Sequence, residues 1–373
     1  MVVVEGRRIA AVVSEGQGGE GTVVDLGGLT LLPGLFNCHT HLCLSGAADP
    51  VRVLAQESYP ATVIQATLRA RHNVEAGVTT IRDLGGRDYA EIAVRDAVRA
   101  GLLPGPRILA AGRGVCMTGG HGWQLLARQA DGADEVRKAV REQLRAGADV
   151  IKLLATGGVM TPGVDPSSAQ LTVEELRAGV EEAHKARRKA AAHAQAEDGI
   201  AFCLSAGIDT IEHGIFLTEA LAARMAAQGT ALVATLVAPH AIVEGGIAAG
   251  IPEFAVKKSA SVRERHLESF RLAMRAGVRI AAGTDAGTPL NPHGTIVPEL
   301  LLMAGAGMPP LEVIRAATSV AAAVTGLEAE TGRVAPGLAA DLLAVEGNPA
   351  DSLKALDAVR LVIADGRTVV SRL

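Results

Sequence analysis

Residues 33–44 read PGLFNCHTHLCL, an apolar segment that carries two histidines, His39 and His41, on either side of Thr40. In a β-strand, residues i and i+2 point to the same face, so the two imidazoles project together while Thr40 points away. This pattern predicts a metal site, and a pair of hydrogen-bonded core histidines is the alternative. The choice between them depends on what the rest of the chain brings to that face.

This segment belongs to the first of eight short apolar stretches, which alternate with longer segments of helical periodicity. Eight successive βα units predict a (β/α)8 TIM barrel over residues 29–333. Right-handed crossovers bring all strand carboxyl ends to one face, where function is expected. The predicted strands span residues 29–41, 78–84, 107–112, 149–156, 189–194, 209–213, 231–236 and 279–286.

The two ends of the chain have a different pattern. Residues 1–28 and 334–373 contain short alternating strands separated by Gly, Asp and Pro turns. Neither piece is long enough to form a core alone, and chain termini often lie close together. We therefore expect an α/β protein in which both termini form one small β-sandwich domain beside the barrel.

The composition of the chain limits the kinds of binding partner that we expect. The chain has 373 residues, a formal net charge of −4 and no Lys/Arg cluster interleaved with aromatic residues, so neither nucleic acid nor an anionic membrane surface is an expected partner. Charges interrupt the apolar run of MVVVEGRRIAAVV, which argues against a signal peptide or a membrane span. We expect a cytoplasmic protein with a small-molecule substrate, and the sequence leaves open whether it forms a homo-oligomer.

Lys152 lies in the middle of the apolar run of the fourth predicted strand, in ADVIKLLATGG. Burial of an ammonium group is unfavourable and lowers its pKa, which yields a neutral amine able to react with CO₂. The resulting carbamate has two oxygens and could bridge two cations. A lysine that reaches the rim of the barrel or pairs with a carboxylate is the alternative.

Three further strand ends carry metal-binding side chains. His193 ends the fifth predicted strand in AAAHAQ, His213 ends the sixth in TIEHG, and Asp285 ends the eighth in RIAAGTDAG. Each signal is weak alone. Together they bring a His or an Asp from three strands to the face that already holds the histidine pair and Lys152, so a shared metal centre is the prediction.

These residues resemble the metal-dependent amidohydrolase superfamily, and the likeness covers almost the entire chain. It includes the LLPGL segment before HTH, the motifs VIKLLATGG, IEHG and GTDAG, and the terminal GRVAPGLAADLLAVEGNP. The segments TGGHGW (118–123), TGGVMTP and ATSVAAAVTGL look like the imidazolonepropionase-like branch, which contains Xaa-Pro and Xaa-Arg/Lys dipeptidases. Lys152 argues against a deaminase, because deaminases of the superfamily usually lack this strand-four lysine.

The resemblance implies two Zn²⁺ ions per chain, although other divalent metals would fit the same ligands. His39, His41, Asp285 and an N6-carboxylated Lys152 would hold the first ion, and Lys152, His193 and His213 the second. Imidazole and carboxylate ligands suit Zn²⁺. A hydroxide bridging the metals would attack the substrate carbonyl, with Asp285 as the catalytic acid and base.

The remaining histidines receive weaker assignments. In dipeptidase-like relatives a histidine in the loop of His121 contacts the substrate, so His121 is expected to act as a catalytic and substrate-binding residue. His293 and His240 are weaker substrate-binding candidates. His240 follows the seventh predicted strand where relatives often carry a tyrosine, and a loop histidine without any role fits equally well. The histidines on predicted helices with charged neighbours are expected at the surface: His72, His184 and His266.

The expected function is hydrolysis of an amide bond in a small substrate, such as an Xaa-Pro or Xaa-Arg/Lys dipeptide or an N-acyl amino acid. The alternative is a hydrolase of carbamate, phenylurea, ester or lactone-type molecules with the same metal centre. A non-catalytic binding protein would require a missing ligand, and all six ligand positions are filled.

Overall fold

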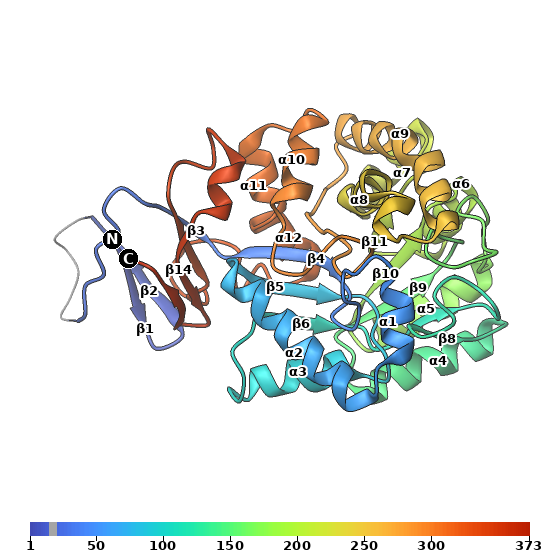
Figure 1. The fold of residues 1–373 in the computed structure, drawn as a ribbon, viewed down its shortest axis with the longest axis horizontal. Coiled ribbons are helices and arrows are strands. Elements are labelled where there is room, and N and C mark those ends of the chain that lie inside the picture. Colours follow the sequence, from blue (N-terminus) through green and yellow to red (C-terminus); the bar gives the residue numbers. More distant parts are fainter. Residues whose placement is uncertain (15–20) are drawn as a thin grey trace.

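The structure is a computed structural model that describes residues 1–14 and 21–373. Figure 1 shows a ring of helices around central strands on one side and a group of short strands on the other. Both chain ends lie together within that second group. The predicted fold class, a TIM barrel with a β-structure formed by both termini, is confirmed.

Seven strands of the barrel run parallel to their neighbours. They fall into two arcs, β4-β5-β6 and β9-β10-β11-β12. A hydrogen bond of 2.8 Å from the Asp149 amide to the Ala110 carbonyl joins the arcs. The strands are β4 (Leu35–Thr40), β5 (Val78–Asp83), β6 (Arg107–Ala110), β9 (Val150–Leu154), β10 (Lys189–Ala194), β11 (Thr210–His213) and β12 (Ala231–Val233).

The predicted eighth strand, residues 279–286, closes the ring without forming a continuous strand. Its pairing is limited to isolated parallel bridges, from Ile280 to Leu232 of β12 and from Ala286 to Thr40 of β4. Between them, the Asp285 amide donates to the His39 carbonyl at 2.8 Å. The left-handed backbone of Asp285, at φ 60°, interrupts the strand where the side chain enters the barrel mouth.

The predicted first strand, residues 29–41, is wrong in one respect, because it is two strands. β3 (Thr30–Pro33) pairs with β13 (Leu342–Val345) in the terminal sheet, and β4 begins the barrel after Gly34. A Cβ at Gly34 would lie 2.1 Å from Thr79 Oγ1 of β5, so the chain passes between the two sheets where only glycine fits.

Twelve α-helices surround the described barrel and connect its strands. Helix α5 begins with a capping box, in which Thr172 and Glu175 satisfy each other's backbone amides. The helices are α1 (Pro50–Gln56), α2 (Tyr59–Glu75), α3 (Ala90–Arg99), α4 (Ala133–Ala146), α5 (Val173–Lys185), α6 (Glu197–Ala206), α7 (Glu219–Gln228), α8 (Val237–Gly245), α9 (Glu253–Arg275), α10 (Val297–Gly305), α11 (Pro310–Ala316) and α12 (Ser319–Thr325). Two short parallel strands, β7 (Gly114–Cys116) and β8 (Ala127–Gln129), flank the loop that carries His121.

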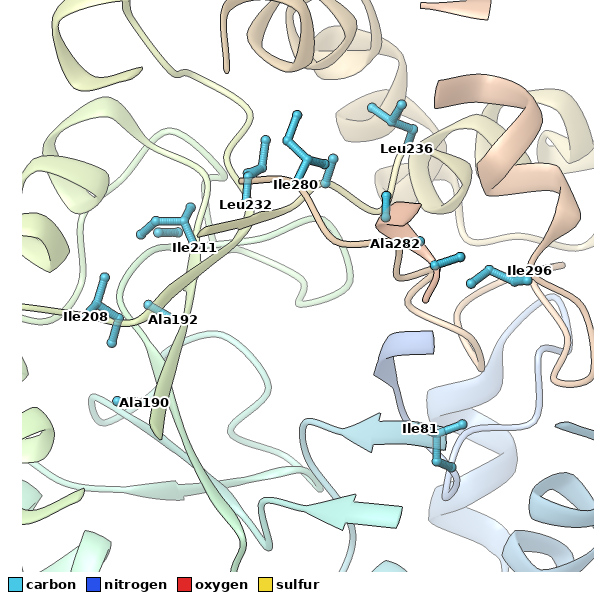
Figure 2. Close-up of a cluster of buried hydrophobic side chains, with 14 of the residues drawn as sticks. Ile81, Ala190, Ala192, Ile208, Ile211, Leu232, Leu236, Ile280, Ala282 and Ile296 are labelled. Carbon is cyan, nitrogen blue, oxygen red and sulfur yellow. The ribbon is translucent and has the colours of Figure 1, made fainter. Parts of the chain in front are cut away.

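The main core lies between the barrel strands and these helices. Neighbouring strands contribute one row of paired residues to it, formed by Ala192, Ile211, Leu232 and Ile280 (Figure 2). Because strand residues alternate in direction, the next residue along β10, His193, points to the barrel interior. The packing that stabilises the barrel thereby fixes which side chains reach the central cavity.

The two termini form two sheets. β1 (Val2–Glu5) pairs with β2 (Arg8–Val12), while β3 joins β13 (Leu342–Val345), β14 (Val359–Ala364) and β15 (Arg367–Ser371). Ile9 of the first sheet is buried in one cluster with Leu342 of the second. The division into residues 1–28 plus 334–373 and residues 29–333 stays a prediction, and residues 15–20 lie outside the described part.

Within residues 1–14 and 21–373, no helix is both long and apolar enough to cross a membrane.

Candidate metal centre

The strand ends meet at one cavity of about 110 Å³ at the mouth of the barrel. This cavity brings together the seven residues expected there. They come from strand β4, the turn after β4, the loop after β7, the strands β9, β10 and β11, and the segment 279–286 that closes the barrel. These are His39, His41, His121, Lys152, His193, His213 and Asp285.

His39, His41 and Asp285 form a group of three ligand atoms that all lie within 4.8 Å of one another. Asp285 Oδ1 lies 3.5 Å from His39 Nε2 and 3.2 Å from His41 Nε2. The imidazole rings of His39 and His41 are 5.3 Å apart between centroids, so the histidine pair of the HTH motif faces a common point.

Hydrogen bonds on the far side of each ring decide which nitrogen faces the centre. His39 Nδ1 lies 2.8 Å from Glu212 Oε2, and His41 Nδ1 lies 2.9 Å from the Gly85 carbonyl oxygen. A carboxylate and a carbonyl can only accept, so each Nδ1 carries the proton and each Nε2 keeps its lone pair. Both lone pairs are therefore directed toward Asp285.

Hydrogen bonds also leave one ring nitrogen free on each of His193 and His213. His213 Nδ1 lies 2.7 Å from Thr235 Oγ1, whose hydroxyl donates to the Ala234 carbonyl, so this nitrogen donates and Nε2 is free. His193 Nε2 donates to the Gly157 carbonyl at 2.8 Å, which leaves Nδ1 free. The two rings are 4.6 Å apart between centroids, and the His213 ring lies 5.0 Å from that of His39.

The donor set fits a divalent cation. Asp285 Oδ1 is buried without a hydrogen-bond donor, and the nearest nitrogens of His39 and His41 present lone pairs to it. Electron pairs at such distances repel each other unless a positive charge lies between them. Imidazole and carboxylate in this combination are ligands of Zn²⁺ and related metals, each imidazole being held by an outer hydrogen bond.

Burial keeps most of these imidazoles neutral. It lowers the pKa of His39, His193 and His213 well below the ordinary value, so each is ready to bind a cation. At His41 burial also lowers the pKa, but the negative charges of the nearby Asp285 and Asp83 carboxylates help to outweigh it and the pKa is raised.

Lys152 is buried on β9, with only 3% of its surface exposed. It forms no ion pair within 4.0 Å among the described residues, so it neither reaches the rim nor pairs with a carboxylate. Burial lowers the pKa of its amine to about 8. A substantial fraction of the amine is thereby available in the neutral, nucleophilic form near physiological pH.

Left-handed backbone turns aim two of these side chains. His213 pairs in register with Ala194, whose side chain belongs to the outer core, so alternation alone would turn His213 away from the cavity. Its φ of 70° reverses that direction, and Asp285 has φ 60°. Such conformations cost roughly 1–3 kcal/mol each for non-glycine residues, and they persist where the surrounding structure enforces them.

Glu212 is a buried residue of the site that the sequence analysis missed. It accepts from Arg82 Nη2 at 2.8 Å and from Thr210 Oγ1 at 2.6 Å, besides its contact with His39. Arg82 donates further to the Cys38 carbonyl at 2.7 Å. The alternation along β11 could have revealed Glu212 as an inward-facing carboxylate, because its register partner is His193.

His121 lies against the centre. Its ring is 4.4 Å from that of His193 between centroids, and its Nδ1 is 2.9 Å from Thr161 Oγ1. A Cβ at Gly158 would lie 2.5 Å from His121 Cε1, so this glycine makes room for the ring.

Three other histidines differ from expectation or lie elsewhere. His266 was expected at the surface, which is wrong: it is 1% exposed, lines the cavity and donates from Nε2 to the His213 carbonyl at 3.0 Å. His293 is buried outside the cavity, with Nε2 3.1 Å from the Leu44 carbonyl, so it supports the loop after β4. His240 lies on α8 and is not among the residues that line the cavity.

Apart from these polar groups the cavity wall is mainly apolar. Among the described residues that line it, Lys152 is the only lysine and there is no arginine. The apolar part includes Leu44, Leu126, Val159, Met160, Ile215 and Ile242. The site therefore combines a cluster of metal ligands with an uncharged surrounding surface.

Comparison with known proteins agrees with this arrangement. A model of the amidohydrolase family matches residues 30–369. Ochratoxinase from Aspergillus niger is 34% identical over 358 residues, which cover 87% of this chain and 72% of that protein.

Two solved structures are similar over nearly their whole length. A prolidase complexed with N-methylphosphonate-L-proline has a TM-score of 0.92 and 32% identity, covering 99% of this chain and 94% of that one. A Xaa-Pro dipeptidase with bound methionine in its active site has a TM-score of 0.89 and 33% identity, covering 98% and 94%. The predicted family is confirmed, and the chain belongs to the amidohydrolase family of metal-dependent hydrolases that act on C–N bonds.

Proposed function

We propose that the chain is a binuclear zinc hydrolase that cleaves the amide bond of a small substrate. The observation that carries the proposal is the convergence of lone pairs from His39, His41 and Asp285 beside the free nitrogens of His193 and His213. The substrates we favour are Xaa-Pro or Xaa-Arg/Lys dipeptides and N-acyl amino acids. The similar prolidase and Xaa-Pro dipeptidase structures support this choice.

Lys152 would complete both metal sites as an N6-carboxylated residue. His39, His41 and Asp285 would hold one cation, and His193 and His213 the other. The carbamate of Lys152 would be a ligand of both cations. Two observations support this role: the amine is buried without an ion-pair partner, and burial lowers its pKa to about 8. The carbamate would place one negative charge where neutral imidazoles alone cannot balance two cations.

The bound cations would supply an acidified water and polarise the scissile carbonyl. The chain's own contribution is to hold and move protons. Asp285 takes a proton from the attacking water and passes it to the leaving amine, because its carboxylate lies at the centre of the ligand group. The apolar wall excludes bulk water and so strengthens these polar interactions.

A hydrolase of carbamates, phenylureas, esters or lactones is the second candidate. One observation favours it: the described cavity wall contains no arginine, and its single lysine is assigned to the metals. No positively charged side chain is therefore available there to bind a substrate carboxylate. A neutral substrate would need none. The cytoplasmic location and the homo-oligomer remain predictions.

Metal analysis and a substrate panel on the same sample test the proposal. Protein grown with excess zinc is expected to contain two equivalents of divalent metal, to lose activity on chelation and to regain it when Zn²⁺ is added back. Protein without metal under these conditions would refute the proposal. Inactivity on every Xaa-Pro, Xaa-Arg and Xaa-Lys pair would refute the dipeptidase version, and activity on aryl carbamates would then support the second candidate.

His121 is proposed to contact the substrate, and Gly158→Ala tests this without substituting the histidine itself. The added methyl would collide with the His121 ring and displace it. A displacement of this kind is expected to lower kcat/KM roughly 10- to 100-fold, while metal content stays at the parent value.

Gly305→Ala is the matched control, because nothing lies within 4 Å of its added Cβ and the residue ends helix α10. It should keep the parent kcat/KM. Parent-like kinetics in Gly158→Ala would contradict a role of His121 in substrate contact.

A further inference from the structure

Lys258, on helix α9, directs its ammonium group to the backbone of a single loop. Its Nζ donates to the carbonyls of Gly158 at 3.3 Å, of Thr161 at 2.7 Å and of Val164. An ammonium group has three donors, so these carbonyls use its full hydrogen-bonding capacity. The side chain is half-buried, and Nζ also lies 5.5 Å from the centre of the Phe254 ring, one turn earlier in the helix. Lys258 is therefore placed to fasten the loop to α9.

This loop, residues 155–172, connects β9 to α5 and forms one wall of the metal-centre cavity. Val159 and Thr161 are part of that wall. Val159 also belongs to a buried cluster that includes Ala255 of α9. The apolar contacts hold the side chains of the loop against the helix, and the hydrogen bonds of Lys258 hold its backbone.

The same loop holds His121. Thr161 Oγ1 lies 2.9 Å from His121 Nδ1 and accepts from the Gly122 amide at 2.9 Å. Near the other end of the loop, Gln170 accepts from the His121 amide at 2.9 Å. The ring packs against Gly158, where an added Cβ would be 2.5 Å from Cε1. The position of His121 thus depends on the position of the loop.

These contacts form a continuous path from α9 to the metal centre. Lys258 binds the carbonyl of Thr161, and the hydroxyl of the same threonine contacts the His121 ring. That ring lies 4.4 Å from the ring of His193 between centroids. Lys258 is not among the described residues that line the cavity, so any effect it has on the substrate passes through the loop.

We propose that Lys258 is a positioning residue, which holds the loop of residues 155–172 against α9 and thereby keeps His121 in place for the substrate. The inference rests on the proposed function of the metal centre. It adds a residue outside the cavity on which substrate contact depends.

Lys258→Met tests the proposal, because methionine retains an unbranched side chain but has no hydrogen-bond donor. In the zinc-loaded enzyme it is expected to lower kcat/KM roughly 10- to 100-fold, the cost of a misplaced contact residue. Metal content should stay at the parent value, because Lys258 contacts the loop rather than a metal ligand. Lys257→Met is the matched control, since this neighbouring lysine pairs with Glu253 at 2.7 Å on the surface, and it should keep the parent kcat/KM.

A double-mutant cycle with Thr161→Val shows whether Lys258 acts through the loop. Thr161→Val removes the hydroxyl contact with His121 at similar volume, so it should lower kcat/KM by itself. In that background Lys258→Met is expected to lower kcat/KM further by less than about threefold, because both substitutions break the same path. An equal loss in both backgrounds would mean that the lysine acts on general stability, and would overturn the proposal.

Hydrogen exchange separates this inference from the proposed function, because it requires no turnover. In zinc-loaded Lys258→Met, the amides of residues 157–165 and 120–123 should exchange roughly 10-fold faster than in the parent, whereas those of β9 and β10 should not change. If metal-loaded parent protein cleaves no substrate, the proposed function fails, but this local acceleration still supports the anchoring of the loop. Parent-like exchange in residues 157–165, or a uniform acceleration over the whole chain with a lower Tm, overturns the inference.

Discussion

Lys152→Ala is expected to lower kcat/KM by a factor of roughly a thousand or more, since metal-centre electrostatics contribute several kcal/mol to catalysis. The physical reason is the buried position of the amine on β9 without a carboxylate partner. If its carbamate bridges the cations, removing it leaves neutral imidazoles and a single carboxylate to balance their charge. Metal content should fall below two equivalents per chain, measured on the sample used for kinetics.

Chemical rescue makes this prediction specific. Acetate or propionate should partly restore both activity and metal content, because a short carboxylate can occupy the space of the missing carbamate. Lys138→Ala, at an exposed lysine of α4, is the control and should behave like the parent protein. Full activity with two bound metals in Lys152→Ala would show that the carbamate is not part of the centre.

Much of the barrel could be predicted from the sequence. Hydrophobic periodicity depends only on neighbouring residues, and the order of parallel strands follows general rules of chain connection. Six of the eight predicted barrel strands coincide with observed ones, and the seven histidine, lysine and aspartate residues predicted at the barrel mouth meet in one cavity. The first and eighth strands differ because backbone details override the pattern. Gly34 lets the chain change sheets, and Asp285 turns left-handed within an otherwise extended segment.

Features that depend on tertiary packing could not be predicted from the sequence. His266 lies in the segment RERHLES, where charged neighbours suggest a surface, yet the helix turns this one position toward the backbone of His213. His213 itself reaches the cavity through a left-handed turn rather than through strand alternation. His240 and His293 followed predicted strands, but neither side chain lines the cavity, because loop paths are not encoded in periodicity.

Glu212 is the residue whose substitution should have the largest effect on stability. Its carboxylate accepts from Arg82 and Thr210 on one oxygen and from His39 on the other, and all of these side chains are buried. Glu212→Gln preserves the volume but removes the charge that balances Arg82. Breaking a buried ion pair on one side costs roughly 3–5 kcal/mol, so a marked fall in Tm is expected.

The same substitution should weaken zinc binding. Glu212 fixes the tautomer of His39, and loss of such an outer hydrogen bond typically lowers metal affinity roughly 10- to 100-fold. Competition with a chromogenic chelator measures this change independently of turnover. Glu244→Gln is the control, because Glu244 pairs with Arg263 at 2.9 Å on the surface, where such pairs contribute about 0–1 kcal/mol.

A double-mutant cycle distinguishes the ion pair from the histidine contact. Arg82→Met combined with Glu212→Gln removes both charges, so the double variant should be more stable than the sum of the two single effects implies. Zinc affinity should remain low in the double variant, because the Glu212 carboxylate that orients His39 is still missing. If stability and zinc affinity recovered together, the carboxylate would serve Arg82 alone, and if neither single variant changed, the buried network would have no role in holding the metal ligands.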